Sequence, residues 1–151
     1  MIVDVHSHCW PRPDCFSPSF QADARRMRLS PVNLVTRYED YWNSTGGEDV
    51  VAIAFGGKAR LTGVWIHDDE VAEYVARDPG RMIGFMSLDP TQPGWEDEMH
   101  DGRERLGLAG IKLLPMYAGF YPQDERLEPL CPTQPPEERR PTLQVIYDAS
   151  T

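Results

Sequence analysis

The sequence has no excess of basic residues, no long apolar run and no secretory leader, and each absence excludes a class of protein. Fifteen Lys and Arg residues face 24 Asp and Glu residues, so the formal net charge is -9. This charge argues against a nucleic-acid or acidic-lipid surface. No window approaches ~18 uninterrupted apolar residues, and the first ten residues lack the charged and apolar regions of a leader. We therefore expect a soluble, cytoplasmic protein with a small-molecule substrate and with no nucleic-acid or membrane partner.

Cysteine is scarce and unpaired. Cys9, Cys15 and Cys131 are odd in number and form no C-x-x-C motif, which suits a reducing compartment better than a disulfide framework. Cys9 lies close to two histidines, but the alternation of a strand would point it to the opposite face from His6 and His8. We expect all three cysteines to be spectators.

Short apolar runs alternate with stretches of helical periodicity, a pattern typical of repeated βα units. The pattern predicts strands at 2–6, 50–55, 82–87, 109–114 and 143–147, and helices at about 31–44, 69–77 and 94–106. The segment 10–30 is rich in Pro, Ser and Arg and is expected to be an elaborated loop. Near-continuous apolar strands that alternate with helices indicate a parallel sheet buried on both faces. The fold class is therefore α/β.

Two histidines close the first predicted strand in the segment Val3-Asp4-Val5-His6-Ser7-His8. Side chains at i and i+2 of a strand share a face, so one ion with bonds of ~2.0 Å can touch both imidazoles. Asp4 has the same parity and could accept a hydrogen bond that orients a histidine. The alternative is a pair of polar residues at an ordinary strand exit, but the βα pattern that follows favours a metal site.

The segment Asp4-Val5-His6-Ser7-His8, with Trp10-Pro11 after it, resembles the amidohydrolase-related family, which includes aminocarboxymuconate-semialdehyde decarboxylase-like enzymes and TIM-barrel metal-dependent hydrolases. The resemblance continues through residues 71–85, Gly110-Ile111-Lys112-Leu113-Leu114-Pro115 and residues 120–124, and covers about 130 residues in all. A (β/α)8 barrel takes about 250 residues. The resemblance therefore implies that residues 1–151 are the N-terminal part of a single amidohydrolase-type TIM-barrel domain, with its first four to five βα units.

The resemblance also implies a metal, usually zinc, with His6 and His8 as its first two ligands. The family places a further ligand histidine at the end of the fifth strand, where this sequence has Tyr147 or Asp148. Asp148 could ligate zinc through oxygen, whereas Tyr147 would be a poor substitute. The preceding run from Cys131 to Pro141 is too rich in proline for the helix that the family has there.

Three residues are candidates for substrate binding. Lys112 lies near the end of the predicted fourth strand, where it could position a substrate or pair with a neighbouring carboxylate. Trp10 and Tyr117, with Phe16, Phe20 and Phe120, fall in predicted loops, where they could cover a substrate or pack the loops themselves. Gly56-Gly57-Lys58 lacks the spacing of a phosphate-binding loop.

The expected activity is hydrolysis of a small carboxylated or cyclic substrate by a metal-activated water, with Zn2+ or another divalent ion as cofactor. The same scaffold supports a metal-dependent lyase, either a decarboxylase or a hydratase, and fold alone does not choose between them. A non-catalytic half-barrel is the third possibility. An incomplete barrel exposes two open sheet edges, so we expect a homo-oligomer.

Overall fold

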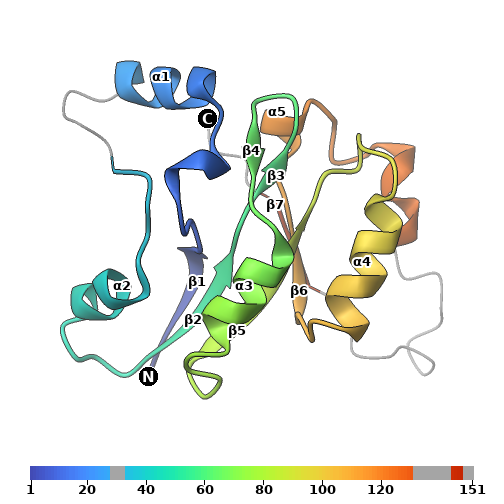
Figure 1. Cartoon of the computed structure of the whole chain (residues 1–151). Helices are drawn as coiled ribbons and strands as arrows, with labels where there is room; N and C mark the ends of the chain where they lie inside the picture. Colours follow the sequence, from blue (N-terminus) through green and yellow to red (C-terminus); the bar gives the residue numbers. More distant parts are fainter. Residues whose placement is uncertain (28–32, 131–143, 148–151) are drawn as a thin grey trace.

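The computed structural model describes residues 1–27, 33–130 and 144–147, and its central feature is a parallel β-sheet (Figure 1). The five strands follow the order β1-β2-β5-β6-β7, and every neighbouring pair is parallel. Their bounds are Ile2–His8, Val50–Phe55, Met82–Leu88, Gly110–Leu113 and Gln144–Tyr147. The five strands predicted from apolar runs are confirmed, with ends that differ by at most two residues.

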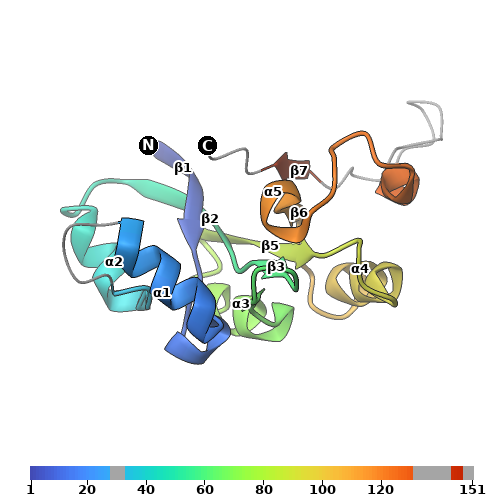
Figure 2. The ribbon, with the colours of Figure 1, turned by 90° about the horizontal axis from the view of Figure 1, so that it is seen from above.

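Helices cover one face of this sheet. Seen from above, the sheet is curled, and α3 (Asp68–Val75) and α4 (Trp95–Glu104) lie on its convex side (Figure 2). Both helices were expected. A side chain at Gly84 would place its Cβ 2.6 Å from Leu108 and 3.1 Å from Val75, so glycine is needed where these residues pack against β5. The result is a mixed α/β structure whose curled sheet is consistent with part of a barrel.

The segment after β1 is more structured than expected. It contains a 3-10 turn, η1 (Pro13–Cys15), and a helix, α1 (Pro18–Met27), where an irregular loop was predicted. The helix begins because the Phe20 backbone N–H donates to Ser17 Oγ at 3.2 Å and because proline is well tolerated at the first helical position. The sequence carries this start signal, but its high proline and arginine content obscured it.

The predicted helix at 31–44 is wrong in its first half. Helix α2 spans only Tyr38–Ser44, and residues 33–37 run without helix beside β1. Here the Thr36 backbone N–H donates to the Trp10 carbonyl at 3.0 Å. The Thr36 N–H is therefore bonded to the end of β1 and not to a carbonyl of its own segment. The periodicity of residues 31–44 carries no information about this contact with another segment.

Three short features join the main elements. Strands β3 (Lys58–Ala59) and β4 (Val64–Trp65) form an antiparallel hairpin between β2 and α3. A single helical turn, α5 (Pro115–Ala118), follows β6, and the 3-10 helix η2 spans Glu125–Leu130. Two-residue strands are too short to produce a periodic signal, so the hairpin was not predicted.

No helix in the part of the chain that the structure describes has the length and apolar character needed to cross a bilayer. At one edge of the sheet, β1 exposes Ile2, Val3 and Val5 by more than half of their surface. The homo-oligomer expected from open sheet edges stays a prediction.

Candidate metal site and aromatic cavity

The imidazoles of His6 and His8 lie side by side at the carboxyl end of β1. Their ring centroids are 4.9 Å apart, with the ring planes at 74°. Each ring also meets the Phe55 ring edge-on at 5.1 Å, so the end of the neighbouring strand β2 supports both. The carboxyl ends of parallel strands are where barrel enzymes build their sites.

A bulge in β1 brings the two histidines to this position. Asp4 pairs with Ala52 and Ser7 pairs with Ala54, so two residues of β1 stand opposite the single residue Ile53. The extra residue reverses the alternation along the strand. Asp4 consequently does not share the face of His6, and the parity expected from the sequence is wrong.

Asp4 instead faces the helix α2. Its Oδ2 accepts a hydrogen bond from the Tyr41 hydroxyl at 2.8 Å, and its Oδ1 accepts one from the His6 backbone N–H at 3.0 Å. Burial and the Asp4 carboxylate together raise the pKa of Tyr41, so this phenol stays a donor at ordinary pH. Asp4 therefore orients the backbone of His6.

Four aromatic side chains line a cavity of about 270 Å³ together with the two histidines. Trp10 stacks on His8 with ring centroids 4.1 Å apart, and its other neighbour is Phe16 at 5.2 Å. Phe20 of α1 continues the series to Tyr117 of α5. The lining consists of His6, His8, Trp10, Phe16, Phe20, Gly56, Gly57, Val64, Leu114 and Tyr117. The structure thus places the predicted Trp10 and Tyr117 in one cavity with the histidine pair.

Lys112 lies deeper, on β6, and is 1% exposed. Its Nζ is 4.5 Å from the centroid of the Phe55 ring, the same ring that both imidazoles contact. It is not part of the cavity lining given above. The Lys112 amino group therefore lies over the ring that also supports the histidine pair.

Cys9 points away from the site, as strand alternation predicted. Its thiol is 1% exposed and its Sγ lies 3.7 Å from the Glu70 carbonyl oxygen of α3. Burial, followed by the charge of Glu70, raises the pKa of Cys9 to about 12. A thiol that stays protonated is a poor nucleophile and a poor metal ligand. Cys15 is also buried, and Cys131 lies outside the described residues.

The separation of the two imidazole rings matches that expected for two ligands of one metal ion. With Zn–N bonds of about 2.0 Å the ion lies roughly 3 Å from each ring centre, so two ligands at a tetrahedral angle have ring centres about 5 Å apart. The observed separation is 4.9 Å. No third His, Cys, Asp or Glu completes a group of three within the described residues. Asp148, the predicted third ligand, lies outside the described residues, and for Tyr147 only the backbone is described.

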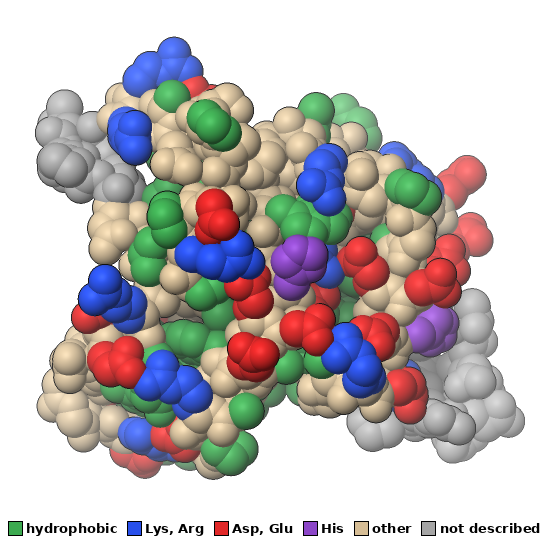
Figure 3. Space-filling view, viewed as in Figure 1, with side chains coloured by type: hydrophobic (Ala, Val, Ile, Leu, Met, Phe, Trp, Pro, Cys, Tyr) green, Lys and Arg blue, Asp and Glu red, His purple; other side chains and the backbone are tan. Residues whose placement is uncertain are grey.

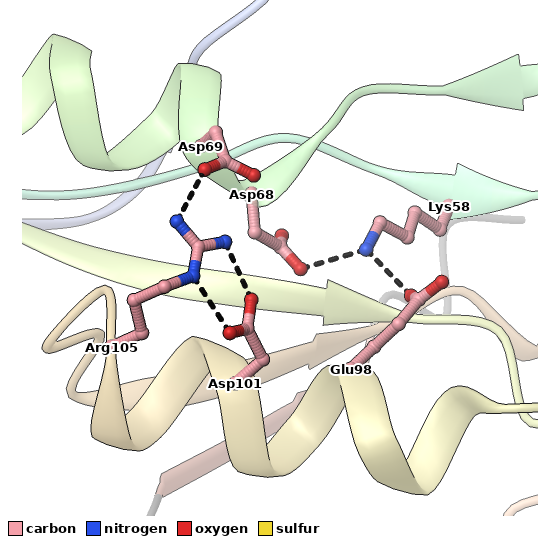
Figure 4. Close-up of polar contacts among 6 residues, drawn as sticks. All are labelled: Lys58, Asp68, Asp69, Glu98, Asp101 and Arg105. Carbon is pink, nitrogen blue, oxygen red and sulfur yellow. Dashed lines mark hydrogen bonds and ion pairs between the residues drawn. The ribbon is translucent and has the colours of Figure 1, made fainter.

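A second polar cluster, which the sequence did not predict, lies between α3, α4 and the hairpin (Figure 4). Lys58 Nζ donates to Asp68 and to Glu98 at 2.7 Å each, and the Lys58 and Asp68 side chains are only 5% and 6% exposed. Asp68 also accepts a hydrogen bond from the Ser87 backbone N–H at 2.8 Å. Burial acts to lower the pKa of Lys58, but the two carboxylates outweigh it and raise that pKa. We call Lys58, Asp68 and Glu98 the lysine cluster.

Next to the lysine cluster is an exposed ion-pair network. Arg105 donates to both oxygens of Asp101 at 2.7 and 2.6 Å and to Asp69 at 2.8 Å. Figure 3 shows acidic and basic side chains interspersed over the face formed by α3 and α4. Asp101 and Arg105 are four residues apart on one helical face, but the other pairing partners are 10 to 40 residues apart in the chain, so sequence spacing gave no signal for those contacts.

Comparison with known proteins yields likeness in structure but no sequence match. No family model and no curated protein matches the chain. A solved structure of a probable 2-pyrone-4,6-dicarboxylic acid hydrolase from Acinetobacter baumannii, with citric acid bound, superposes with a TM-score of 0.49 at 10% identity. The match covers 75% of this chain and 37% of that one. At this level of similarity it assigns neither family nor activity, so the function is argued from the residues of the site.

Proposed function

We propose that this chain contributes the first ligands of a divalent-metal site in an amidohydrolase-type (β/α)8 barrel that hydrolyses a small carboxylated or cyclic substrate. One observation carries the proposal: two imidazoles with centroids 4.9 Å apart line an aromatic cavity at the carboxyl edge of a parallel sheet. A pair of strand-end histidines in solvent would have no such wall around it.

The residues divide the work between holding an ion and holding a substrate. His6 and His8 each offer a ring nitrogen to zinc or a similar ion, and Asp148 is our candidate for a further ligand. When bound, a divalent ion supplies Lewis acidity that activates water and polarises a carbonyl group. Trp10 and Tyr117 exclude bulk water and hold the flat or cyclic part of the substrate.

Lys112 is proposed to attract the carboxylate of the substrate. Its ammonium lies against the Phe55 ring that supports both imidazoles, and it is enclosed, so its charge is little screened by water. The cavity lining itself contains no Asp, Glu, Lys or Arg among the residues described.

Metal content is the decisive test. The purified chain would be loaded with Zn2+, dialysed and analysed for metal beside a His6→Ala/His8→Ala variant. We expect about one zinc per chain in the parent and none above background in the variant, since the variant keeps only Asp148 of the three proposed ligands. The matched control is His67→Ala/His100→Ala, which removes the other two histidines of the chain from exposed positions and should retain the metal.

Two outcomes would contradict the proposal. Equal zinc in the parent and in the His6→Ala/His8→Ala variant would mean that the metal binds elsewhere, and no zinc in either would mean that this chain alone forms no site. Zinc that is lost on Asp148→Ala would support the third ligand.

The reaction type needs a separate assay. A panel of small carboxylated lactones and esters would be screened with the zinc-loaded chain, and the His6→Ala/His8→Ala variant would serve as the blank. Hydrolysis incorporates oxygen from labelled water into the product, whereas release of carbon dioxide without this label would indicate a decarboxylase.

A further inference from the structure

Among the strands that the structure describes, β1 lies at the edge of the sheet and has a partner, β2, on one side only. At the end of the strand the Cys9 backbone N–H donates to the Phe55 carbonyl of β2 at 2.8 Å. The neighbouring groups, the His8 carbonyl and the Trp10 N–H, point to the other edge because successive peptide groups of a strand alternate in direction. Hydrogen bonds to these two backbone groups therefore also influence the position of the His8 imidazole.

Thr36 takes the place of a strand at this edge. Its hydroxyl donates to the His8 carbonyl at 2.9 Å and accepts from the Trp10 N–H at 2.9 Å. Its own backbone N–H donates to the Trp10 carbonyl at 3.0 Å. One residue, 28 positions away from His8 in the chain, thus makes three hydrogen bonds to the segment that carries His8 and its stacking partner.

Tyr41, five residues further on, makes a similar connection to His6. Its hydroxyl donates to Asp4 at 2.8 Å, and Asp4 accepts from the His6 backbone N–H at the bulge. Thr36 and Tyr41 belong to the same connection between β1 and β2, the second of them on α2. The two histidines are therefore held from one segment, each through its backbone.

We propose that Thr36 and Tyr41 are positioning residues that set the separation of the His6 and His8 imidazoles for metal binding, an inference that rests on the proposed function. Thr36 has the larger part, because it acts directly on the backbone of His8 whereas Tyr41 acts through Asp4. Residues that orient metal ligands without touching the metal typically change metal affinity about 10–100-fold when they are replaced.

The experiment compares four single variants of the full chain. Thr36→Val keeps the shape of the side chain and removes the hydroxyl, Thr36→Ser restores the hydroxyl, and Tyr41→Phe removes the contact with Asp4. Thr45→Val is the control, because the Thr45 hydroxyl also donates to a backbone carbonyl of the same segment, that of Trp42 at 2.8 Å, but does not reach β1. Each variant is titrated with Co2+ by absorption spectroscopy, and the imidazole resonances of the metal-free protein are recorded by NMR.

We expect Thr36→Val to weaken Co2+ binding about 10-fold or more, with a smaller loss in Tyr41→Phe. Thr36→Ser should bind within about threefold of the parent, and Thr45→Val should be indistinguishable from it. In the metal-free spectra, Thr36→Val should shift the His8 ring signals while Thr36→Ser and Thr45→Val leave them in place. Chemical denaturation of each variant would show that it is folded at the titration temperature.

The two proposals fail in different ways. If the parent binds Co2+ through His6 and His8 and Thr36→Val binds it equally well, the positioning role is wrong and the proposed function stands. If Thr36→Ser is as weak as Thr36→Val, the hydroxyl is not responsible and the positioning role is again wrong. If the parent binds no metal, the proposed function fails, and the shift of the His8 signals decides by itself whether Thr36 positions that ring.

Discussion

The histidine pair and the lysine cluster are both groups of ionisable side chains near the carboxyl edge of the sheet, but they are built in opposite ways. In the lysine cluster, opposite charges are paired. Lys58 donates to two carboxylates, and Asp68 accepts from Lys58 and from a backbone N–H. Around His6 and His8 the cavity is lined by aromatic, aliphatic and glycine residues, and the backbones of the two histidines are fixed from outside the cavity. The first arrangement closes a junction between elements, whereas the second lines a cavity.

The comparison shows that burial of a charged group is by itself a poor guide to function. Lys58 and Asp68 are more deeply buried than His6 or His8, yet their hydrogen bonds connect the hairpin, α3, α4 and β5. A cluster whose charges neutralise one another mainly supports the fold. We expect substitutions in the lysine cluster to change stability and substitutions in the histidine pair to change binding.

Lys58→Met should have the largest effect on stability. It leaves the buried carboxylate of Asp68 without its counter-ion, a loss that typically costs about 3–5 kcal/mol. The measurement is the free energy of unfolding by urea. In the same assay, His6→Ala/His8→Ala should lose only about 1 kcal/mol, because His6 is exposed and His8 half-buried. Similar losses in the two variants would remove the distinction between the two regions.

Glu98→Gln provides the internal control for Lys58→Met. Its side chain is 40% exposed, so water can replace part of the lost contact, and we expect a loss of about 1 kcal/mol or less. A loss as large as that of Lys58→Met would mean that Glu98, rather than Asp68, is the essential partner of the lysine.

Cys9 should react much more slowly in the folded chain than in the unfolded one. Its pKa is about 12 in the fold against 9.0 for an ordinary thiol, and the thiolate is the reactive form. At pH 8 we expect alkylation by iodoacetamide to slow by at least about 100-fold, as measured by mass spectrometry of the Cys9 peptide. Fast labelling in the native state would place the thiol on the open side of β1, with the histidines.

The same pKa predicts how Cys9 contributes to stability as pH changes. Because the folded pKa is raised, the favourable contribution of the neutral thiol is fully present below pH 9.0 and is lost as pH rises through about 12. A Cys9→Ala variant should therefore lose less stability than the parent between these pH values. Parallel curves for the two proteins would argue against a buried, protonated thiol.

Arg105→Gln should have the smallest effect. It breaks the hydrogen bonds to Asp101 and Asp69, but these groups lie in solvent, where ion pairs contribute little. We expect no measurable change in the urea midpoint at 0.15 M salt. A clear loss of stability would show that the exposed network next to the lysine cluster also supports the packing of α3 on α4.

Most of the parallel sheet could be predicted from the sequence. Strands β2 and β5 are nearly continuous apolar runs, because most of their residues are buried on both faces of the sheet. Helix α3 was predictable from Val71 and Tyr74, which fall on one buried face. By contrast, the hairpin of β3 and β4 was missed, since two residues cannot display a period.

The candidate site was predictable only in part. His6 and His8 stand out because two imidazoles separated by one residue at the end of a strand can share an ion. Regular strand alternation would place Asp4 on the same face as the two histidines, but the bulge between Asp4 and Ser7 puts it on the opposite face. Thr36 and Tyr41 could not be identified, because their contacts with β1 join residues that are 26 to 37 positions apart.

The parallel α/β architecture and the pair of histidines at the end of the first strand follow from local patterns of apolar and polar residues, so both can be predicted from the sequence. The side chains that surround those histidines, the residues that hold their backbones and the charges that neutralise one another become evident only in the folded chain. These contacts depend on how strands and connections lie together in space. A pattern read along one strand carries no information about the segment that packs against its edge.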